Sequence, residues 1–576
     1  MRIHRLKLIT LFLFLFLMTG LIKIQVFENS YYKDLSQENR IRIIPIKAAR
    51  GNIYDRNGKV LARSRLSFSV AVIPKEVSSN NELFARLSKI LNVNPALLIN
   101  KMKKDALSPF NPVVIQSDIP KDKAILIEED KDKLPGVIIQ TEPLREYIYS
   151  EATAHIIGYV GKPNINELQK LKTYGYKPTD LIGRAGIEKS FNSYLKGKDG
   201  GYQVEVDSRG RRIKVIGYKK PRKGKDIYLT IDIDIQNYIY ELIKDKKAAV
   251  CLMSPDTGKI ISLVSSPSFN PNIFINPDNK KNRLINQLFN SDSYPMVNRC
   301  IQTAYPVGSL FKIVTSIAAL ETDSISETQQ FNCPGYFKLG GRVFHCWKES
   351  GHGLQTVRQA LKNSCNVFFY NVGLKVGVDN LTKYAKKFGF GEKTGIQLPD
   401  EARGLVPSKH WKLKTKNEPW YDGETVIFAI GQGYFLATPL QALRMISAIA
   451  NGGNLVYPQI VERIEDVDIG YPEPKSLNLE DKNIQIVKEG LDLVVSEYGT
   501  GQKAQVEGLE VAGKTATAQV SSGLTHAWFG CFFPVDKPEY AIIVFMEHGG
   551  SGGWNAAPLG KKIIEYIRDH YMENKS

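Results

Sequence analysis

In the stretch Tyr305-Pro306-Val307-Gly308-Ser309-Leu310-Phe311-Lys312, a serine and a lysine stand three residues apart in a chain of 576 residues. This spacing places Ser309 and Lys312 on one face of a helix. A neutral lysine in that position can take the serine's proton and leave the serine oxygen as a nucleophile. Because so short a pattern also recurs by chance, its meaning depends on partner motifs further along the chain.

Two further motifs follow in order. Ser364-Cys365-Asn366 supplies a hydroxyl and an amide, and Gly513-Lys514-Thr515-Ala516-Thr517 supplies a second lysine with two hydroxyls. The residues on both sides of the later motif, 509–512 and 518–520, alternate between apolar and polar types as a strand does. Together the three motifs indicate an acyl-transfer site built on a serine nucleophile.

Lys393-Thr394-Gly395 competes for the place of the third motif, because it spells Lys-Thr-Gly in full. It stands in a glycine-rich run, residues 388–399, which predicts a loop. The third motif has to lie on a strand at the edge of the site, where its backbone can pair with an extended substrate. We therefore assign the role to Lys514 and Thr515.

The motifs resemble those of class B penicillin-binding proteins of the cell-elongation type. The resemblance covers nearly the whole chain and also rests on residues 50–58, 183–188, 430–434, 438–441 and 526–529. It implies a peptidoglycan D,D-transpeptidase that cross-links stem peptides during cell elongation and is a target of β-lactams. It also implies an α+β, serine β-lactamase-like domain with an antiparallel sheet flanked by helices. An elongated N-terminal pedestal of the dimerisation type and a single transmembrane helix would precede that domain.

The resemblance also implies a role for each motif residue. Lys312 deprotonates Ser309, and the Ser309 and Thr517 backbone N–H groups hold the oxyanion. Ser364 passes a proton to the departing D-alanine, and Asn366 positions Lys312 and the donor amide. Lys514 supplies positive charge. Thr515 and Thr517 bind the terminal carboxylate. Ala516 stands where the family has glycine, so its methyl group could crowd the donor.

Two other functions stay open. The first is a D,D-carboxypeptidase or β-lactam-hydrolysing enzyme on the same fold, although no Glu-x-x-Leu-Asn sequence follows Ser364 to supply a class A deacylating base. The second is a non-catalytic scaffold of the elongation complex, for which Ala516 is the only hint.

Three cysteines and a histidine gather in a short window: Cys333, Cys346, His352 and Cys365. Three thiols and one imidazole form a regular structural zinc set. The resemblance adds that some elongation-type relatives hold zinc with acidic residues, a histidine and a cysteine. We expect one structural zinc per chain, with a Cys333–Cys346 disulfide or neither as alternatives, and His345 as a possible substitute for His352.

The N-terminus predicts a membrane anchor. We divide the chain into a cytoplasmic tail (1–7), a transmembrane helix (8–27), the pedestal (28–225) and the transpeptidase domain (226–572). The basic residues before the apolar run place the N-terminus in the cytoplasm and the bulk of the chain in the periplasm or outside the cell. A cleaved signal peptide is the alternative, but no Ala-x-Ala-like site follows the run.

The net charge of +18 suits an anionic membrane or wall polymer, unless the charge is spread evenly. No basic run of nucleic-acid type is present, so we predict no nucleic-acid partner. The resemblance implies a RodA-like SEDS glycosyltransferase as the partner in the elongation complex.

Several secondary-structure elements can be predicted from periodicity. We expect a strand over 68–73, one helix over 82–104, strand and turn over 144–161, a linker or extended hairpin over 196–225, a hairpin over 248–264, a buried helix over 307–322, strands over 528–533 and 540–545, and a closing helix over 558–568.

Overall fold

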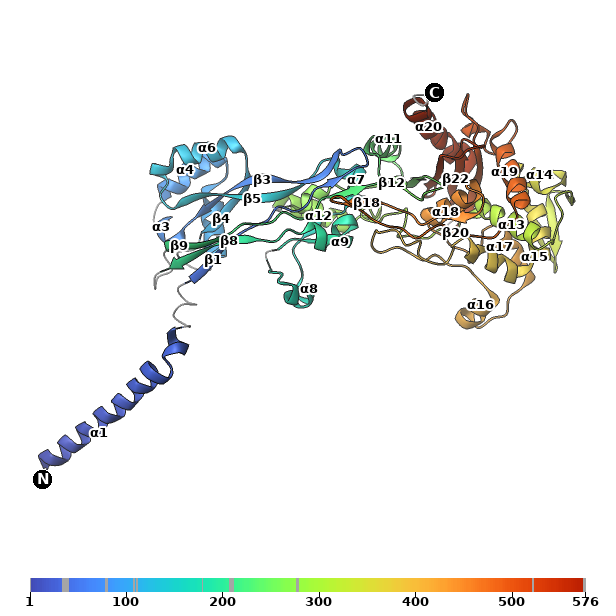
Figure 1. The fold of residues 1–576 in the computed structure, drawn as a ribbon. Coiled ribbons are helices and arrows are strands. Elements are labelled where there is room, and N and C mark those ends of the chain that lie inside the picture. The colour runs from blue at the N-terminus through green and yellow to red at the C-terminus, as the bar shows by residue number, and fades with distance from the viewer. Residues whose placement is uncertain are drawn as a thin grey trace. The chain divides into compact units, whose positions relative to one another are not determined.

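The computed structural model describes residues 2–33, 41–77, 81–106, 109, 112–178, 180–206, 212–275, 279–520 and 523–572 (Figure 1). Contacts group the chain into two units. The first contains residues 1–51, 64–144 and 196–224, and the second contains residues 52–63, 145–195 and 225–576. The predicted division at residue 225 stays a prediction.

The N-terminal helix is long and apolar enough to cross a membrane. It comprises α1 (Arg2–Ile22) and the continuing turn η1 (Lys23–Phe27). Residues 3–27 form a 25-residue span of which no part is buried by the rest of the chain. At 1.5 Å per residue this is about 37 Å, enough for a hydrocarbon core of about 30 Å.

The rest of the first unit contains two β structures. β1 (Ile41–Ile46), β8 (Gly200–Val206) and β9 (Arg212–Lys219) form a three-stranded antiparallel sheet, so residues 196–225 hold the predicted hairpin. β3 (Val60–Val72) pairs with β4 (Val113–Ile119) and β5 (Val137–Tyr147). The apolar side chains of β3 and β4 pack against α3 (Pro74–Val77), α4 (Asn81–Leu91), α5 (Pro95–Asp105) and α6 (Lys121–Glu129).

The prediction of one helix over 82–104 was wrong, because α4 and α5 are separate. Asn92 between them has φ +57°, a left-handed conformation that ends a helix. Asn94 then caps α5 by accepting a hydrogen bond from the Ala96 N–H at 2.9 Å, and Pro95 is the first helical residue.

The second unit begins with short elements. β2 (Ile53–Tyr54) lies parallel to β10 (Ile227–Leu229), which pairs with β18 (Val461–Ile464), and β18 with β19 (Val467–Asp468). Residues 144–161 contain a helix as well as strand. The other elements here are α7 (Ser150–Ile157), β6 (Val160–Gly161), α8 (Ile165–Leu171), β7 (Ile182–Gly183), α9 (Gly186–Ser190) and α10 (Asn192–Leu195).

A five-stranded antiparallel sheet organises the rest of this unit. Its order is β12 (Ile260–Ser266), β11 (Ala248–Met253), β23 (Tyr540–Met546), β22 (Thr525–Phe533) and β21 (Ala512–Gln519). One face packs against α11 (Ile233–Ile243) and α20 (Ala557–Ile567). The other face meets α18 (Pro439–Ala450), since a Cβ added at Gly530 would lie 3.2 Å from Ile446 Cγ1. The predicted α+β fold, with an antiparallel sheet flanked by helices, is confirmed.

Helices and small hairpins surround the sheet. The helices are α12 (Asn279–Phe289), α13 (Lys312–Glu321), α14 (Val357–Lys362), α15 (Asn366–Lys387), α16 (Lys409–Lys416), α17 (Asp422–Ala429) and α19 (Asp481–Val495). The small strands are β13 (Phe331–Cys333) with β16 (Gly353–Gln355), β14 (Tyr336–Leu339) with β15 (Arg342–His345), and β17 (Asn454–Leu455) with β20 (Lys475–Ser476). All functional residues considered below belong to this second unit.

Candidate active site

Ser309 lies on a tight turn at the start of a buried helix. Residues 308–311 form a 3-10 turn, and Lys312 is the first residue of α13. A side chain at Gly308 would stand 3.3 Å from the Cβ of Ala518, so glycine permits the turn to approach β21 closely. Ser309 is partly exposed and lines a cavity. Within the described part of the chain, no hydrogen bond involves its hydroxyl.

Lys312 is completely buried, with 0% of its surface exposed. Its Nζ donates to the backbone oxygen of Ser364 at 2.8 Å, to Ser364 Oγ at 3.2 Å and to Asn366 Oδ1 at 2.7 Å. Burial lowers the pKa of Lys312 from 10.5 to about 8. A fraction of the amine is therefore neutral near physiological pH, as a general base requires.

The second motif connects α14 to α15. Ser364 has φ +48° and is buried, and this left-handed residue breaks the helical path between the two helices. Cys365 then caps α15, with its Sγ accepting from the Phe368 N–H at 3.5 Å. The turn carries the Ser364 hydroxyl and the Asn366 amide to the Lys312 amine. We call Ser309, Lys312, Ser364 and Asn366 the catalytic cluster.

The third motif lies on β21, as its alternation predicted. β21 pairs with β22 on one side and is the last strand of its sheet, so its other edge can accept an extended peptide. Lys514 is fully buried, and burial, with a smaller effect of the Lys312 charge, lowers its pKa well below the ordinary value. Thr517 is exposed, and its Oγ1 accepts a hydrogen bond from the Gly552 N–H at 3.1 Å.

The competing Lys-Thr-Gly segment lies in a loop and has a different partner. Thr394 is buried, and its N–H and Oγ1 both donate to Glu401 Oε1, at 2.8 and 2.6 Å. The Glu401 carboxylate therefore already holds the Thr394 hydroxyl and N–H that a substrate would need. The assignment of Lys393 and Thr394 to a loop is confirmed.

A cavity of about 1010 Å³ joins the motifs. Five of the predicted catalytic and substrate-binding residues line it, Ser309, Ser364, Asn366, Thr515 and Thr517, and so does the predicted metal ligand Cys346. Lys312 and Lys514 are buried beneath its surface. Sequence reasoning missed Trp347, Lys503 and Trp554, which also line the cavity, because they come from segments without a motif.

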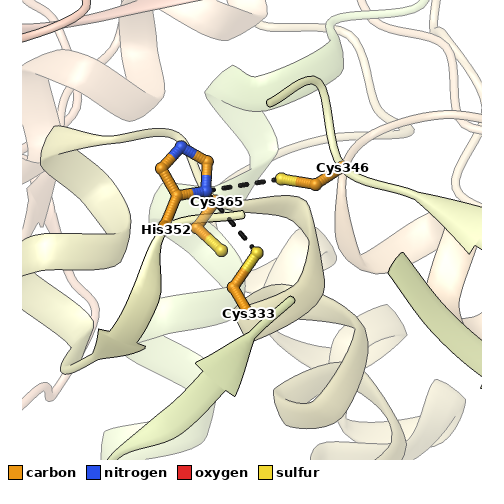
Figure 2. Close-up of side chains that lie close together, drawn as sticks. All are labelled: Cys333, Cys346, His352 and Cys365. Carbon is orange, nitrogen blue, oxygen red and sulfur yellow. Dashed lines mark hydrogen bonds between the residues drawn. The ribbon is translucent and has the colours of Figure 1, made fainter. Parts of the chain in front are cut away.

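The four predicted metal ligands lie together (Figure 2). Their ligand atoms are all within 4.8 Å of one another. His352 Nδ1 lies 3.6 Å from Cys333 Sγ and 3.5 Å from Cys346 Sγ, and all six cysteines of the chain are free. We call Cys333, Cys346, His352 and Cys365 the cysteine cluster.

The cysteine cluster favours a thiolate. A hydrogen bond from the Cys365 thiol, aided by contact with His352, holds the pKa of Cys346 well below its ordinary value. Metal ligands must be deprotonated, so this setting suits a cation. His345 does not belong to the group: it is an exposed residue of β15 whose backbone oxygen accepts a hydrogen bond from Tyr370.

Two family models match the chain. The penicillin binding protein transpeptidase domain matches residues 248–565, and the penicillin-binding protein dimerisation domain matches residues 45–229. The first match covers more than half of the chain and contains every residue of the catalytic and cysteine clusters.

Similar whole proteins are also known. Peptidoglycan D,D-transpeptidase MrdA of Acinetobacter baumannii is 34% identical over 94% of this chain and 84% of its own length. The protein of the same name from Escherichia coli K12 is 31% identical over 97% and 93%.

Among solved structures, a penicillin-binding protein (PBP2) from Helicobacter pylori in complex with MreC has a TM-score of 0.80 at 30% identity, over 91% of this chain and 99% of its own. A chain of a peptidoglycan synthase complex has a TM-score of 0.76 at 31% identity, over 98% and 97%.

Proposed function

This chain belongs to the penicillin-binding protein transpeptidase family as a peptidoglycan D,D-transpeptidase, and we propose that Ser309 is the nucleophile that carries its acyl group. One observation carries this role. The buried amine of Lys312, one helical turn from Ser309, is held by Ser364 and Asn366 at the floor of a cavity that β21 borders.

Acylation begins when neutral Lys312 takes the proton of the Ser309 hydroxyl. The Ser309 Oγ then attacks the carbonyl carbon between the two D-alanines of a donor stem peptide. The backbone N–H groups of Ser309 and Thr517 stabilise the resulting oxyanion, a contribution of about 10²–10³ in rate per donor.

Expulsion of the terminal D-alanine requires a proton on its nitrogen. The Ser364 hydroxyl, which accepts from Lys312 Nζ at 3.2 Å, is suited to pass that proton on. Asn366 holds the same amine at 2.7 Å, and its amide N–H is available to the donor. The carbon–nitrogen bond breaks and leaves an ester on Ser309, which an amine of a second stem peptide attacks.

The donor is recognised along the edge of β21. An extended peptide pairs there with the backbone, and Thr515 and Thr517 bind its terminal carboxylate. An incoming carboxylate favours the charged form of Lys514, because an opposite charge raises the pKa of a buried amine.

Labelling by a fluorescent penicillin tests this function. The wild-type protein should form a long-lived covalent adduct, and Ser309→Ala should form none. Rapid release of the label would favour the carboxypeptidase or β-lactam-hydrolysing alternative. A wild-type protein that takes no label would instead favour the scaffold alternative.

The apolar N-terminal helix fits a single-pass anchor, and we extend the proposal to its topology and partners. The N-terminus lies in the cytoplasm and the bulk of the chain lies in the periplasm or outside the cell, in the elongation complex with a RodA-like SEDS glycosyltransferase. Related chains occur with MreC and in a peptidoglycan synthase complex, which supports such partners. Protease digestion of spheroplasts should remove all but the anchor, and the glycosyltransferase should copurify.

The cysteine cluster is proposed to hold one structural zinc. Three thiolates and one imidazole make a closed tetrahedral set, and the His352 Nδ1 faces the sulfurs. The cluster would tie β13 and the segment after β15 to the first turn of α15, next to Ser364 and Asn366. Metal analysis should give one zinc per chain. No zinc, with a Cys333–Cys346 cross-link in the mass spectrum, would reject the site.

A further inference from the structure

Among the described residues that line the cavity, Lys503 is the only lysine, arginine, aspartate or glutamate. Its Nζ lies 3.2 Å from the centre of the Trp554 ring, and Trp554 is itself 69% exposed. Across the described residues no carboxylate forms an ion pair with Lys503. A cation held over an aromatic face, without an acidic partner, is ready to receive an anion from the cavity.

The position of Lys503 relative to β21 indicates which substrate it meets. The turn that leads to it packs beside Thr515, since a Cβ on Gly501 would lie 3.5 Å from Thr515 Cγ2. The loop that carries Trp554 packs against the turn that leads to Lys503, since a Cβ on Gly553 would lie 2.6 Å from the backbone oxygen of Thr500. Lys503 and Trp554 are therefore near the Thr515 end of the strand.

The two ends of β21 serve different parts of the reaction. Ser309 approaches the strand near Thr517 and Ala518, as the contact of Gly308 with these residues shows. In the proposed function Thr515 and Thr517 bind the terminal carboxylate of the donor, and the Thr517 N–H also holds the oxyanion, so the carboxylate lies on the Thr515 side of the reacting carbonyl and the body of the donor extends toward Gln519. The space beyond Thr515 is the side from which D-alanine departs and which the acceptor amine then enters.

We propose that Lys503, positioned by Trp554, binds a carboxylate on the residue that carries the attacking acceptor amine. This inference rests on the proposed function and names a specificity determinant for its second step. In that step the amine nitrogen forms a bond to the acyl carbon, the ester bond to Ser309 Oγ breaks, and the amine proton returns to Ser309 through Lys312. The ion pair fixes the amine near the ester, which raises the rate of transfer over hydrolysis.

A matched pair of acceptors tests the proposal. The full-length protein in detergent is acylated with an acyl-D-alanyl thioester, and transfer is measured to D-alanine and to D-alaninamide, which differ only in the carboxylate. The different basicity of the two amines affects every variant alike. The preference for D-alanine should fall about fivefold to tenfold in Lys503→Met, as for loss of one partly exposed charge-assisted contact. It should largely survive in Lys503→Arg.

Two more variants separate position from charge. Trp554→Leu keeps the lysine but removes its support, so the preference should fall by less than in Lys503→Met. Lys338→Met is the control, because Lys338 also lies over an aromatic ring, that of Tyr336 at 5.5 Å, but does not line the cavity. It should leave the preference unchanged.

Acylation by fluorescent penicillin distinguishes a failure of the proposed function from a failure of the role of Lys503. If the wild-type protein takes no label, the proposed function fails. If labelling is normal but Lys503→Met keeps the full preference for D-alanine, only the role of Lys503 is overturned. A Lys503→Met protein that loses acylation as strongly as transfer would also overturn it, since Lys503 would then serve the donor.

Discussion

The catalytic cluster and the cysteine cluster meet in three consecutive residues, yet the pKa of the key group in each is lowered by a different cause. Ser364 and Asn366 hold the amine of Lys312, while Cys365 between them joins two thiols and an imidazole. In the catalytic cluster, burial lowers the pKa of a cation so that it can act as a base. In the cysteine cluster, neighbouring groups favour a thiolate that can bind a metal. In the proposed function the first cluster performs the chemistry and the second supports it.

The sharpest test of this difference removes the base. Lys312→Met keeps the length and apolar stem of the side chain but cannot accept the Ser309 proton. Acylation by penicillin should fall by about 10²–10⁴-fold, the usual contribution of general base catalysis. Stopped-flow labelling measures the rate, and thermal unfolding is the control. A protein that still acylates at the wild-type rate would remove Lys312 from the mechanism.

Removing the proposed zinc should have the reverse effect, with stability affected more than chemistry. Chelation, or Cys365→Ser, should lower the melting temperature by about 5 °C or more, because a structural zinc contributes its binding energy to folding. Acylation should slow by about tenfold, as expected when groups near a metal site lose their support. Cys531→Ser is the matched control, since Cys531 is also buried but lies outside the cluster. Equal effects of Cys365→Ser and Cys531→Ser would argue against a structural metal at the cysteine cluster.

The pH profile of acylation tests the catalytic cluster without a mutation. Only neutral Lys312 can accept the proton, and its pKa is about 8. The acylation rate should therefore rise about tenfold per pH unit below pH 8 and level off above it. The measurement is the second-order rate of penicillin acylation between pH 6 and 10. A rate independent of pH over this range would show that the lysine is neutral throughout or is not the base.

The motif residues could be predicted because local spacing carries their geometry. Lys312 follows Ser309 by about one helical turn, and the alternation around Lys514 distinguished a strand from the loop at Lys393. The same reasoning could not find Lys503 and Trp554, which are 51 residues apart and meet only through packing of their loops. It also merged α4 with α5, although Asn94 before Pro95 is a readable start signal for a new helix.

The smallest expected effect concerns Ala516, where the chain departs from its family. Ala516 is buried on β21, lines the cavity and lies between the two threonines proposed to bind the donor carboxylate. If its methyl group crowds the donor, Ala516→Gly should speed penicillin acylation by about twofold to threefold, because glycine allows closer approach to the strand. Ala512→Gly is the control on the same strand, because Ala512 is also buried but does not line the cavity. Unchanged or slower acylation would mean that the methyl group is accommodated, and that the edge of β21 tolerates alanine as well as it tolerates glycine.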